Sequence, residues 1–419
     1  MPNSKTAALL ISGGDERLDL SRKGFNKYGV KPTPDDEILT FSSSTASSIS
    51  STNFAIADNL RKQLEQNNFS IEICNKEINR QKMQWRKLMG VDDENQIIFS
   101  PSGTDLHALV ANQIVDNSLI IMVQSSETGS GVASALNQKN VEIKSVTLRL
   151  DNGLLRPISE IDAEIVFLTE KAISQNKNVL LILVDQSKTG MIAPSMNCAI
   201  ALKTRFENCV KVLIDACQFR LSNETLKMYL HHDFMLALTG SKFLAAPSFS
   251  GILVLPKLFN LSIQNEETNV GLLLRMEIAL NQYQQFCSLH DYQIQIVIRD
   301  FSQFIQNYLN TSPYFELLEM PILQRENLTW DSLPTIFSFL LLRDKQPLSI
   351  AETREIYQQL PQQNPRCQLG QPVMITETKS ALRLCLSAPL IVQATQSDWH
   401  RQVLIKQALQ VLTTLERII

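Results

Sequence analysis

Seven short apolar runs, each bounded by turn residues, dominate the middle of the chain. Most of them are rich in β-branched residues and wholly apolar, as are strands of a parallel sheet that is buried on both faces. Several are separated by stretches with helical spacing, such as DLHALVANQIV and SMNCAIALKTRFENC. The runs occupy residues 96–100, 119–123, 141–148, 179–185, 210–215, 234–239 and 251–256.

This alternation predicts an α/β fold with a mainly parallel seven-stranded sheet. The last two strands are expected to be antiparallel, because only about a dozen residues without helical spacing separate them. From about residue 290 the chain has longer polar helical stretches around the strand-like runs TIFSFLLLRD and ALRLCLSAP, which predicts a smaller α+β C-terminal domain. The expected division is an amino-terminal segment at 1–60, a large domain at 61–285 and a small domain at 286–419.

The composition excludes several classes of protein. The 39 basic and 42 acidic residues give a net charge of −3, and no basic run interleaves with aromatic residues, so we expect no nucleic-acid partner. The seven cysteines include no CxxC pair, which indicates reduced thiols rather than disulfides or a zinc site. No apolar stretch is long enough for a signal peptide or a membrane span. We therefore expect a cytoplasmic protein that acts on a small molecule.

Ligands of open α/β sheets bind at the carboxyl ends of the strands, so the residues that follow each run are the first candidates. Ser102, Gly103 and Thr104 follow the first run and directly precede a helix. Backbone N–H groups, a hydroxyl and the helix dipole at this position favour a phosphate group. The simpler alternative is that these residues only cap the helix.

Two charged residues stand at the ends of later runs. Asp215 ends the fifth run, where a carboxylate is unfavourable unless a cation such as a protonated pyridine nitrogen meets it. Gln218, one turn onward, can hydrogen-bond a ring substituent. Lys242 is either an exposed turn residue or a desolvated amine that forms a Schiff base with a carbonyl cofactor, and Thr239 and Ser241 beside it are further phosphate ligands. This order of groups suits pyridoxal phosphate.

Three motifs carry a resemblance to a known family. SPSGTDLHAL, IDACQ and DFMLALTGSKFLAAPSFSGILVL resemble the phosphate loop, the Asp-x-x-Gln motif and the Schiff-base segment of fold type I pyridoxal-phosphate enzymes, in the class V aminotransferase and cysteine desulfurase superfamily. The resemblance is best over residues 96–256. It implies a homodimer with shared active sites, in which Lys242 forms the Schiff base and Asp215 meets the pyridine nitrogen. Gln218 would meet the ring oxygen, and the implied phosphate ligands are Ser102, Gly103, Thr104, Thr239 and Ser241.

The same resemblance suggests substrate contacts outside the large domain. Arg383 in ALRLCLSAP matches an arginine that grips a substrate carboxylate, although it could also be a surface residue on an edge strand. The amino-terminal arm lines the active site in this fold, or else only covers the sheet. Its candidate residues are Arg17, Asn26, Tyr28, Ser44 and Thr45.

The chain departs from the family pattern in two segments, one of which is the Schiff-base segment, where Ser241 directly precedes Lys242 without the extra residue that usually separates them in the aminotransferase branch. Desulfurases place a histidine over the cofactor ring, whereas this chain has SSETGSG at 125–131, so we expect Glu127 or Thr128 to contact the cofactor there. Cys367 stands roughly where some desulfurases carry a persulfide thiol. Pro365 and Gly370 on either side predict a loop, as such a thiol requires, but a lone cysteine in a polar loop is more often inert.

The sequence therefore predicts a pyridoxal-phosphate-dependent aminotransferase with an amino-acid substrate, in which Lys242 also carries the Cα proton. A lyase or cysteine desulfurase of the same fold is the first alternative. A regulator that keeps the fold without catalysis is the second.

Overall fold

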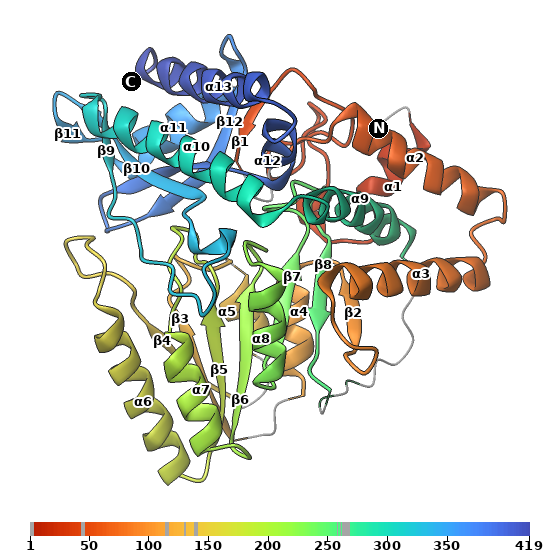
Figure 1. Ribbon diagram of the computed structural model, residues 1–419, viewed down its shortest axis with the longest axis vertical. Helices are drawn as coiled ribbons and strands as arrows, with labels where there is room; N and C mark the ends of the chain where they lie inside the picture. The colour runs from red at the N-terminus through yellow and green to blue at the C-terminus, as the bar shows by residue number, and fades with distance from the viewer. Residues whose placement is uncertain are drawn as a thin grey trace.

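Two β-sheets organise the computed structural model, which describes residues 4–42, 47–113, 117–129, 131–137, 141–257, 259, 261 and 269–419. Figure 1 shows the large sheet in the lower half of the molecule and the small sheet at the upper left. The described residues include no helix that is long and apolar enough to span a bilayer.

The large sheet has the strand order β2-β8-β7-β6-β5-β3-β4. Strand β8 runs antiparallel to both β2 and β7, and every other neighbouring pair is parallel. Its strands are β2 (Ile97–Ser100), β3 (Ser118–Val123), β4 (Glu142–Val146), β5 (Asn178–Val184), β6 (Val210–Ala216), β7 (Met235–Thr239) and β8 (Gly251–Val254). The predicted seven-stranded sheet and its antiparallel last pair are thus confirmed.

Successive side chains of each central strand are buried on opposite faces of the sheet. On β5, Leu180 and Ile182 belong to the core beneath α4 (Gly103–Ala111) and α5 (Val132–Leu136), whereas Leu181 belongs to the core of the other face. Figure 1 shows the helices that cover that other face. They are α6 (Ile158–Ser174), α7 (Met196–Arg205) and α8 (Asn223–His231). Because both faces are covered, the sheet offers its carboxyl ends to a ligand.

The small sheet combines the two ends of the chain. Its order is β1-β12-β13-β10-β11, with β9 paired to β10. Its strands are β1 (Leu39–Phe41), β9 (Phe315–Leu317), β10 (Ile336–Arg343), β11 (Gln346–Pro347), β12 (Cys367–Met374) and β13 (Ser380–Cys385). Its helices are α10 (Asp291–Thr311), α11 (Ile350–Gln359), α12 (Ala388–Ala394) and α13 (Asp398–Glu416). The predicted α+β character is confirmed, while the domain boundaries at 60 and 285 stay predictions.

Helix α9 (Val270–Cys287) is buried along most of its length and holds the amino-terminal arm in place. Its Arg275 donates to the carbonyl oxygens of Ser12 (2.7 Å) and Phe249 (2.8 Å), and burial lowers the pKa of this guanidinium to about 9. The arm is therefore fixed beside the loop between β7 and β8. The remaining helices are α1 (Lys5–Leu10), α2 (Ser51–Glu65), α3 (Ile71–Met89) and three 3₁₀ turns at Glu16–Leu18, Trp330–Ser332 and Leu360–Gln362.

A buried ion pair joins the large sheet to the chain that precedes β10. Asp185 follows β5 and is fully buried. Its carboxylate accepts from Arg325 Nη2 at 2.8 Å and from the Tyr229 hydroxyl at 2.7 Å. Arg325 Nε also lies 3.4 Å from the buried carboxylate of Asp331. The contact stabilises the fold only while both charges are present, because a single charge left in this interior would be unpaired.

Replacing Arg325 with methionine should lower the free energy of unfolding by about 3–5 kcal/mol, since it leaves the buried Asp185 without a cation. Urea unfolding followed by tryptophan fluorescence measures the change. Arg343→Met is the matched control, because Arg343 pairs with Glu352 at 2.9 Å on the surface and should contribute less than about 1 kcal/mol. Equal small losses in the two variants would contradict the account.

Candidate active site

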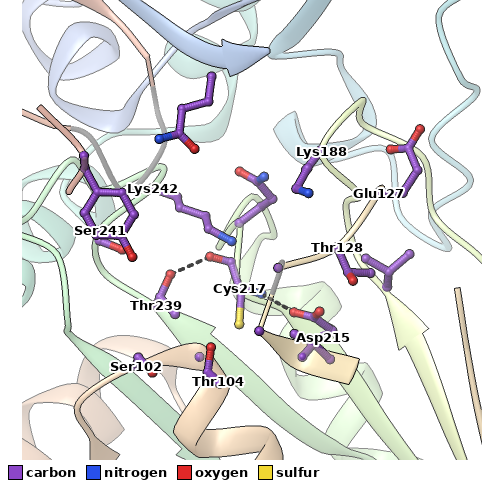
Figure 2. Close-up of a pocket in the computed structure, with 18 of the residues that line it drawn as sticks. Ser102, Thr104, Glu127, Thr128, Lys188, Asp215, Cys217, Thr239, Ser241 and Lys242 are labelled. Carbon is purple, nitrogen blue, oxygen red and sulfur yellow. Dashed lines mark hydrogen bonds between the residues drawn. The ribbon is translucent and has the colours of Figure 1, made fainter. Parts of the chain in front are cut away.

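A cavity of about 220 Å³ lies at the carboxyl ends of β5, β6 and β7, and Figure 2 shows part of its lining. Its walls come from the large sheet, from the amino-terminal arm and from the small sheet. The predicted residues that line it are Arg17, Tyr28, Ser102, Gly103, Thr104, Glu127, Thr128, Asp215, Gln218, Thr239, Ser241, Lys242 and Arg383. Asn26 lines a separate small cavity, and Ser44 and Thr45 lie outside the described residues.

Asp215 is the last residue but one of β6 and is almost wholly buried. One carboxylate oxygen accepts from the backbone N–H of Cys217 at 3.2 Å. The other lies 3.6 Å from Nε2 of His107, a fully buried histidine on α4. His107 Nδ1 lies 2.7 Å from the carbonyl oxygen of Gly103, and since a carbonyl can only accept, Nδ1 carries a hydrogen. His107 Nε2 therefore lies close to the Asp215 carboxylate without a hydrogen bond to it, a proximity that the sequence did not predict.

The start of α4 packs tightly against the end of β6. A Cβ atom on Gly103 would come within 2.8 Å of the Cys217 sulfur, so this close approach requires glycine. Ser102 caps the helix, since its hydroxyl accepts from Asp105 N–H at 3.2 Å and donates to the Asp105 carboxylate at 2.7 Å. The Ser102 hydroxyl therefore caps the helix, which is the simpler of the two interpretations of this residue. Gly103 and Thr104 at the start of α4 line the cavity, and their backbone N–H groups can bind an anion there.

Lys242 lies on a loop whose backbone is fixed on both sides. Its carbonyl accepts from Ala245 N–H at 3.0 Å, and the next residue, Phe243, donates its N–H to the Gln218 carbonyl at 3.3 Å. The Phe243 ring is buried and stacks on Trp330 with 5.2 Å between ring centroids. Figure 2 shows the Lys242 side chain pointing into the cavity, which favours the amine interpretation over an exposed turn lysine.

Glu127 and Thr128 have different surroundings. The Glu127 carboxylate is buried, and it accepts from Arg149 Nε at 3.0 Å and from the hydroxyls of Ser187 and Thr189, both at 2.8 Å. In Figure 2 this carboxylate points away from Lys242. Its partners already satisfy it, so Glu127 anchors the turn, and Thr128 is the better candidate for contact with a ligand.

Three buried polar atoms at the cavity have no hydrogen-bond partner among the described residues. They are Thr128 Oγ1, Gln218 Oε1 and Gln186 Nε2, and all three residues line the cavity. An unsatisfied buried polar atom costs about 1–3 kcal/mol, so the three together indicate a polar ligand. Gln186 was not among the predicted site residues, although it stands just after the fourth apolar run, where such a residue is expected.

Arg383 reaches the cavity from the small sheet. It is 4 % exposed and stands on β13, which has neighbours on both sides, so the surface alternative is wrong. Its Nε and Nη2 donate to the Gln371 carbonyl at 3.2 and 3.0 Å, and its Nη1 donates to the Lys188 carbonyl at 3.4 Å. These contacts hold the guanidinium fork at the edge of the cavity.

The amino-terminal arm contributes Arg17 and Tyr28 to the lining. Asp15 binds both Nε and Nη2 of Arg17, with 2.6 Å to Nη2. The guanidinium carbon of Arg17 lies 4.8 Å from the ring centre of Phe249, in the loop that follows Lys242. The amino-terminal arm therefore forms part of one wall of the cavity and does more than cover the sheet.

Cys367 differs from the sequence prediction. It is the first residue of β12 rather than part of a loop, because it pairs with Leu39 of β1. Its side chain is fully buried, and burial raises the pKa of the thiol to about 11. Cys217 does line the cavity, but burial and the adjacent Asp215 raise the pKa of its thiol well above the usual value. Neither thiol has the character of a nucleophile.

The described chain resembles solved structures of pyridoxal-phosphate enzymes. The cystine C–S lyase C-DES, in a complex with cysteine persulfide, shares 15% identity and a TM-score of 0.60, over 89% of this chain and 97% of the lyase. The cysteine desulfurase CsdA of Escherichia coli shares 13% identity and a TM-score of 0.57, over 90% and 95% of the two chains. Serine palmitoyltransferase of Sphingomonas wittichii shares 14% identity and a TM-score of 0.52, over 82% and 78%.

No protein-family model matches the sequence, and a comparison with curated proteins gives no match. At these identities the structural similarity establishes the fold. The chain has an α/β fold similar to that of the C–S lyase and the cysteine desulfurases, which agrees with the fold that the three motifs predict.

Native protein should leave Cys367 and Cys217 unmodified by iodoacetamide at about pH 8. A thiol with a pKa of about 11 is thiolate in only about one molecule in a thousand at that pH, and both sulfurs are also buried. Peptide mass spectrometry of native and urea-unfolded samples measures the labelling. Fast native labelling of Cys367 would contradict its placement in a strand and would support a persulfide role.

Proposed function

We propose that the cavity binds pyridoxal phosphate and that the protein uses it to transform an amino acid. The observation that carries this proposal is the convergence of Asp215 and Lys242, from the ends of the neighbouring strands β6 and β7, on one cavity. The unsatisfied atoms of Thr128, Gln186 and Gln218 fit the polar substituents of the cofactor ring. The fold similarity to a C–S lyase and to cysteine desulfurases supports the same conclusion.

Each side chain has a task that suits its surroundings. When it is bound, the cofactor supplies a ring that accepts electrons from the Cα of the substrate. The Lys242 amine holds the cofactor aldehyde and then moves the Cα proton. Asp215, which accepts from the Cys217 N–H, would keep a proton on the ring nitrogen. Thr128 and Gln218 hold the ring substituents.

Two further contacts complete the proposed site. The N–H groups of Gly103 and Thr104 at the start of α4 hold the phosphate, as helix N-termini commonly do. Arg383 binds the substrate carboxylate with its planar fork. Since Arg383 belongs to the small sheet, the substrate would lie between the two sheets.

Within this class we propose an aminotransferase, and a lyase is the second candidate. The similarity to the C–S lyase favours the lyase, since that enzyme shares the fold over most of both chains. The buried state of Cys367 disfavours a desulfurase that stores sulfur on this thiol. The homodimer with shared sites and the cytoplasmic location also stay proposals, which rest on the family resemblance.

A half reaction distinguishes these candidates. An aminotransferase keeps the donor's amino group until an acceptor arrives, so cofactor-loaded protein given a donor alone should release a single equivalent of keto acid per site and stop. A lyase needs no acceptor and would continue to release product, and a regulator would release none. Quantification of keto acid over time measures the outcome.

Lys242→Ala is the control for the half reaction. It should bind the cofactor and release no keto acid, because the contacts to ring and phosphate remain while the proton carrier is lost. Sustained release of keto acid by this variant would refute the role of Lys242.

A further inference from the structure

A second lysine faces the same cavity, and none of the roles proposed above uses its side chain. Lys188 stands in the turn after β5, and Figure 2 shows its amine pointing into the space that Lys242 enters from another side. Its Nζ donates to the carbonyl oxygens of Ser126 at 3.0 Å and Ser125 at 3.3 Å. An ammonium group has three protons, so these two carbonyls leave one for a group in the cavity.

The cavity has more positive than negative charge around Lys188. The lining contributes the cations Lys188, Lys242 and Arg383, besides Arg17, which Asp15 already binds. Of the carboxylates in the lining, Glu127 is satisfied by Arg149 and two hydroxyls. Burial, with Arg383 and Lys242 nearby, lowers the pKa of Lys188 to about 8, although Glu127 opposes the shift. An anion bound here would relieve this excess of positive charge.

The other carboxylate of the lining, Asp215, has a different position. Its carboxylate accepts from the Cys217 N–H near the end of β6, and among the ion pairs of the described residues none includes Lys188. The proposed phosphate site is also separate. It follows β2, which lies beyond β7 and β8 in the sheet, whereas Lys188 follows β5 and contacts the turn after β3. Neither group therefore accounts for Lys188.

We propose that Lys188 binds a second anionic group on the substrate, so that the preferred amino acids have an acidic side chain. This inference rests on the proposed function, because it assigns the α-carboxylate to Arg383 and the amine to the reaction centre. The Lys188 backbone carbonyl accepts from Arg383 Nη1 at 3.4 Å, so the Arg383 guanidinium lies beside the Lys188 backbone, and both side chains line the same cavity. Two cations that line one cavity suit the two acidic groups of one short molecule.

The test compares amino acids that differ in the charge of the side chain. For cofactor-loaded protein, kcat/KM should be higher for glutamate than for glutamine, for aspartate than for asparagine, or for phosphoserine than for serine. The pair with the largest ratio distinguishes a carboxylate from a phosphate side chain. Lys188→Met should lower that ratio by about tenfold or more, which corresponds to about 1.4 kcal/mol. Lys188→Arg should keep most of the ratio, because it keeps the charge.

Lys144→Met is the matched control, since Lys144 is an exposed lysine on β4 and pairs with Glu142. It should leave the ratio unchanged. A loss of kcat in Lys188→Met that is equal for the acidic and the neutral member of each pair would overturn the proposal and indicate a proton-transfer role. Wild-type ratios near one would overturn it as well.

A binding measurement separates this inference from the proposed function. Calorimetry should show tighter binding of glutarate than of butyrate to the wild type, and Lys188→Met should remove the difference. This experiment needs no turnover, so it stands even if the protein converts none of the amino acids, an outcome that would refute the proposed function alone. Equal binding of glutarate and butyrate by the wild type would refute the role of Lys188.

Discussion

The burial of both faces of the large sheet is the constraint on which the rest of the structure depends. Helices α4 and α5 cover one face and α6, α7 and α8 cover the other, so the central strands carry apolar side chains inward on both sides. Charged groups that serve a ligand must then stand where the strands end. Asp215 and Lys188 follow that rule directly, and Lys242 follows it after a short turn.

The two carboxylates that line the cavity, Glu127 and Asp215, have different roles because their hydrogen-bond partners differ. Glu127 is neutralised by Arg149 and by hydroxyl donors, so it holds the turn after β3 in place. Among the described residues, Asp215 accepts from the Cys217 N–H and forms no ion pair with a lysine or arginine, which leaves its charge for a ligand cation. A protonated ring nitrogen is such a cation, and a buried carboxylate is stable when it is paired in this way.

The sequence predicted the features that depend on local pattern. The seven runs became the seven strands because apolar periodicity is a local property, and Asp215 and Lys242 became candidates because one ends such a run and the other follows one. Features that depend on contacts between residues far apart in the sequence were not predicted. Lys188 reads as an ordinary turn lysine until Arg383 of the small sheet packs against its carbonyl, and Cys367 reads as a loop residue until it pairs with Leu39.

The most direct test of the account is the identity of the lysine that holds the cofactor. Borohydride treatment of the cofactor-loaded protein fixes the cofactor aldehyde covalently to that lysine, and peptide mass spectrometry locates the added mass. Two lysines face the cavity, so the result is informative in either case. The account predicts the added mass on the peptide that contains Lys242 and none on the peptide that contains Lys188. Modification of Lys188, or of neither lysine, would contradict it.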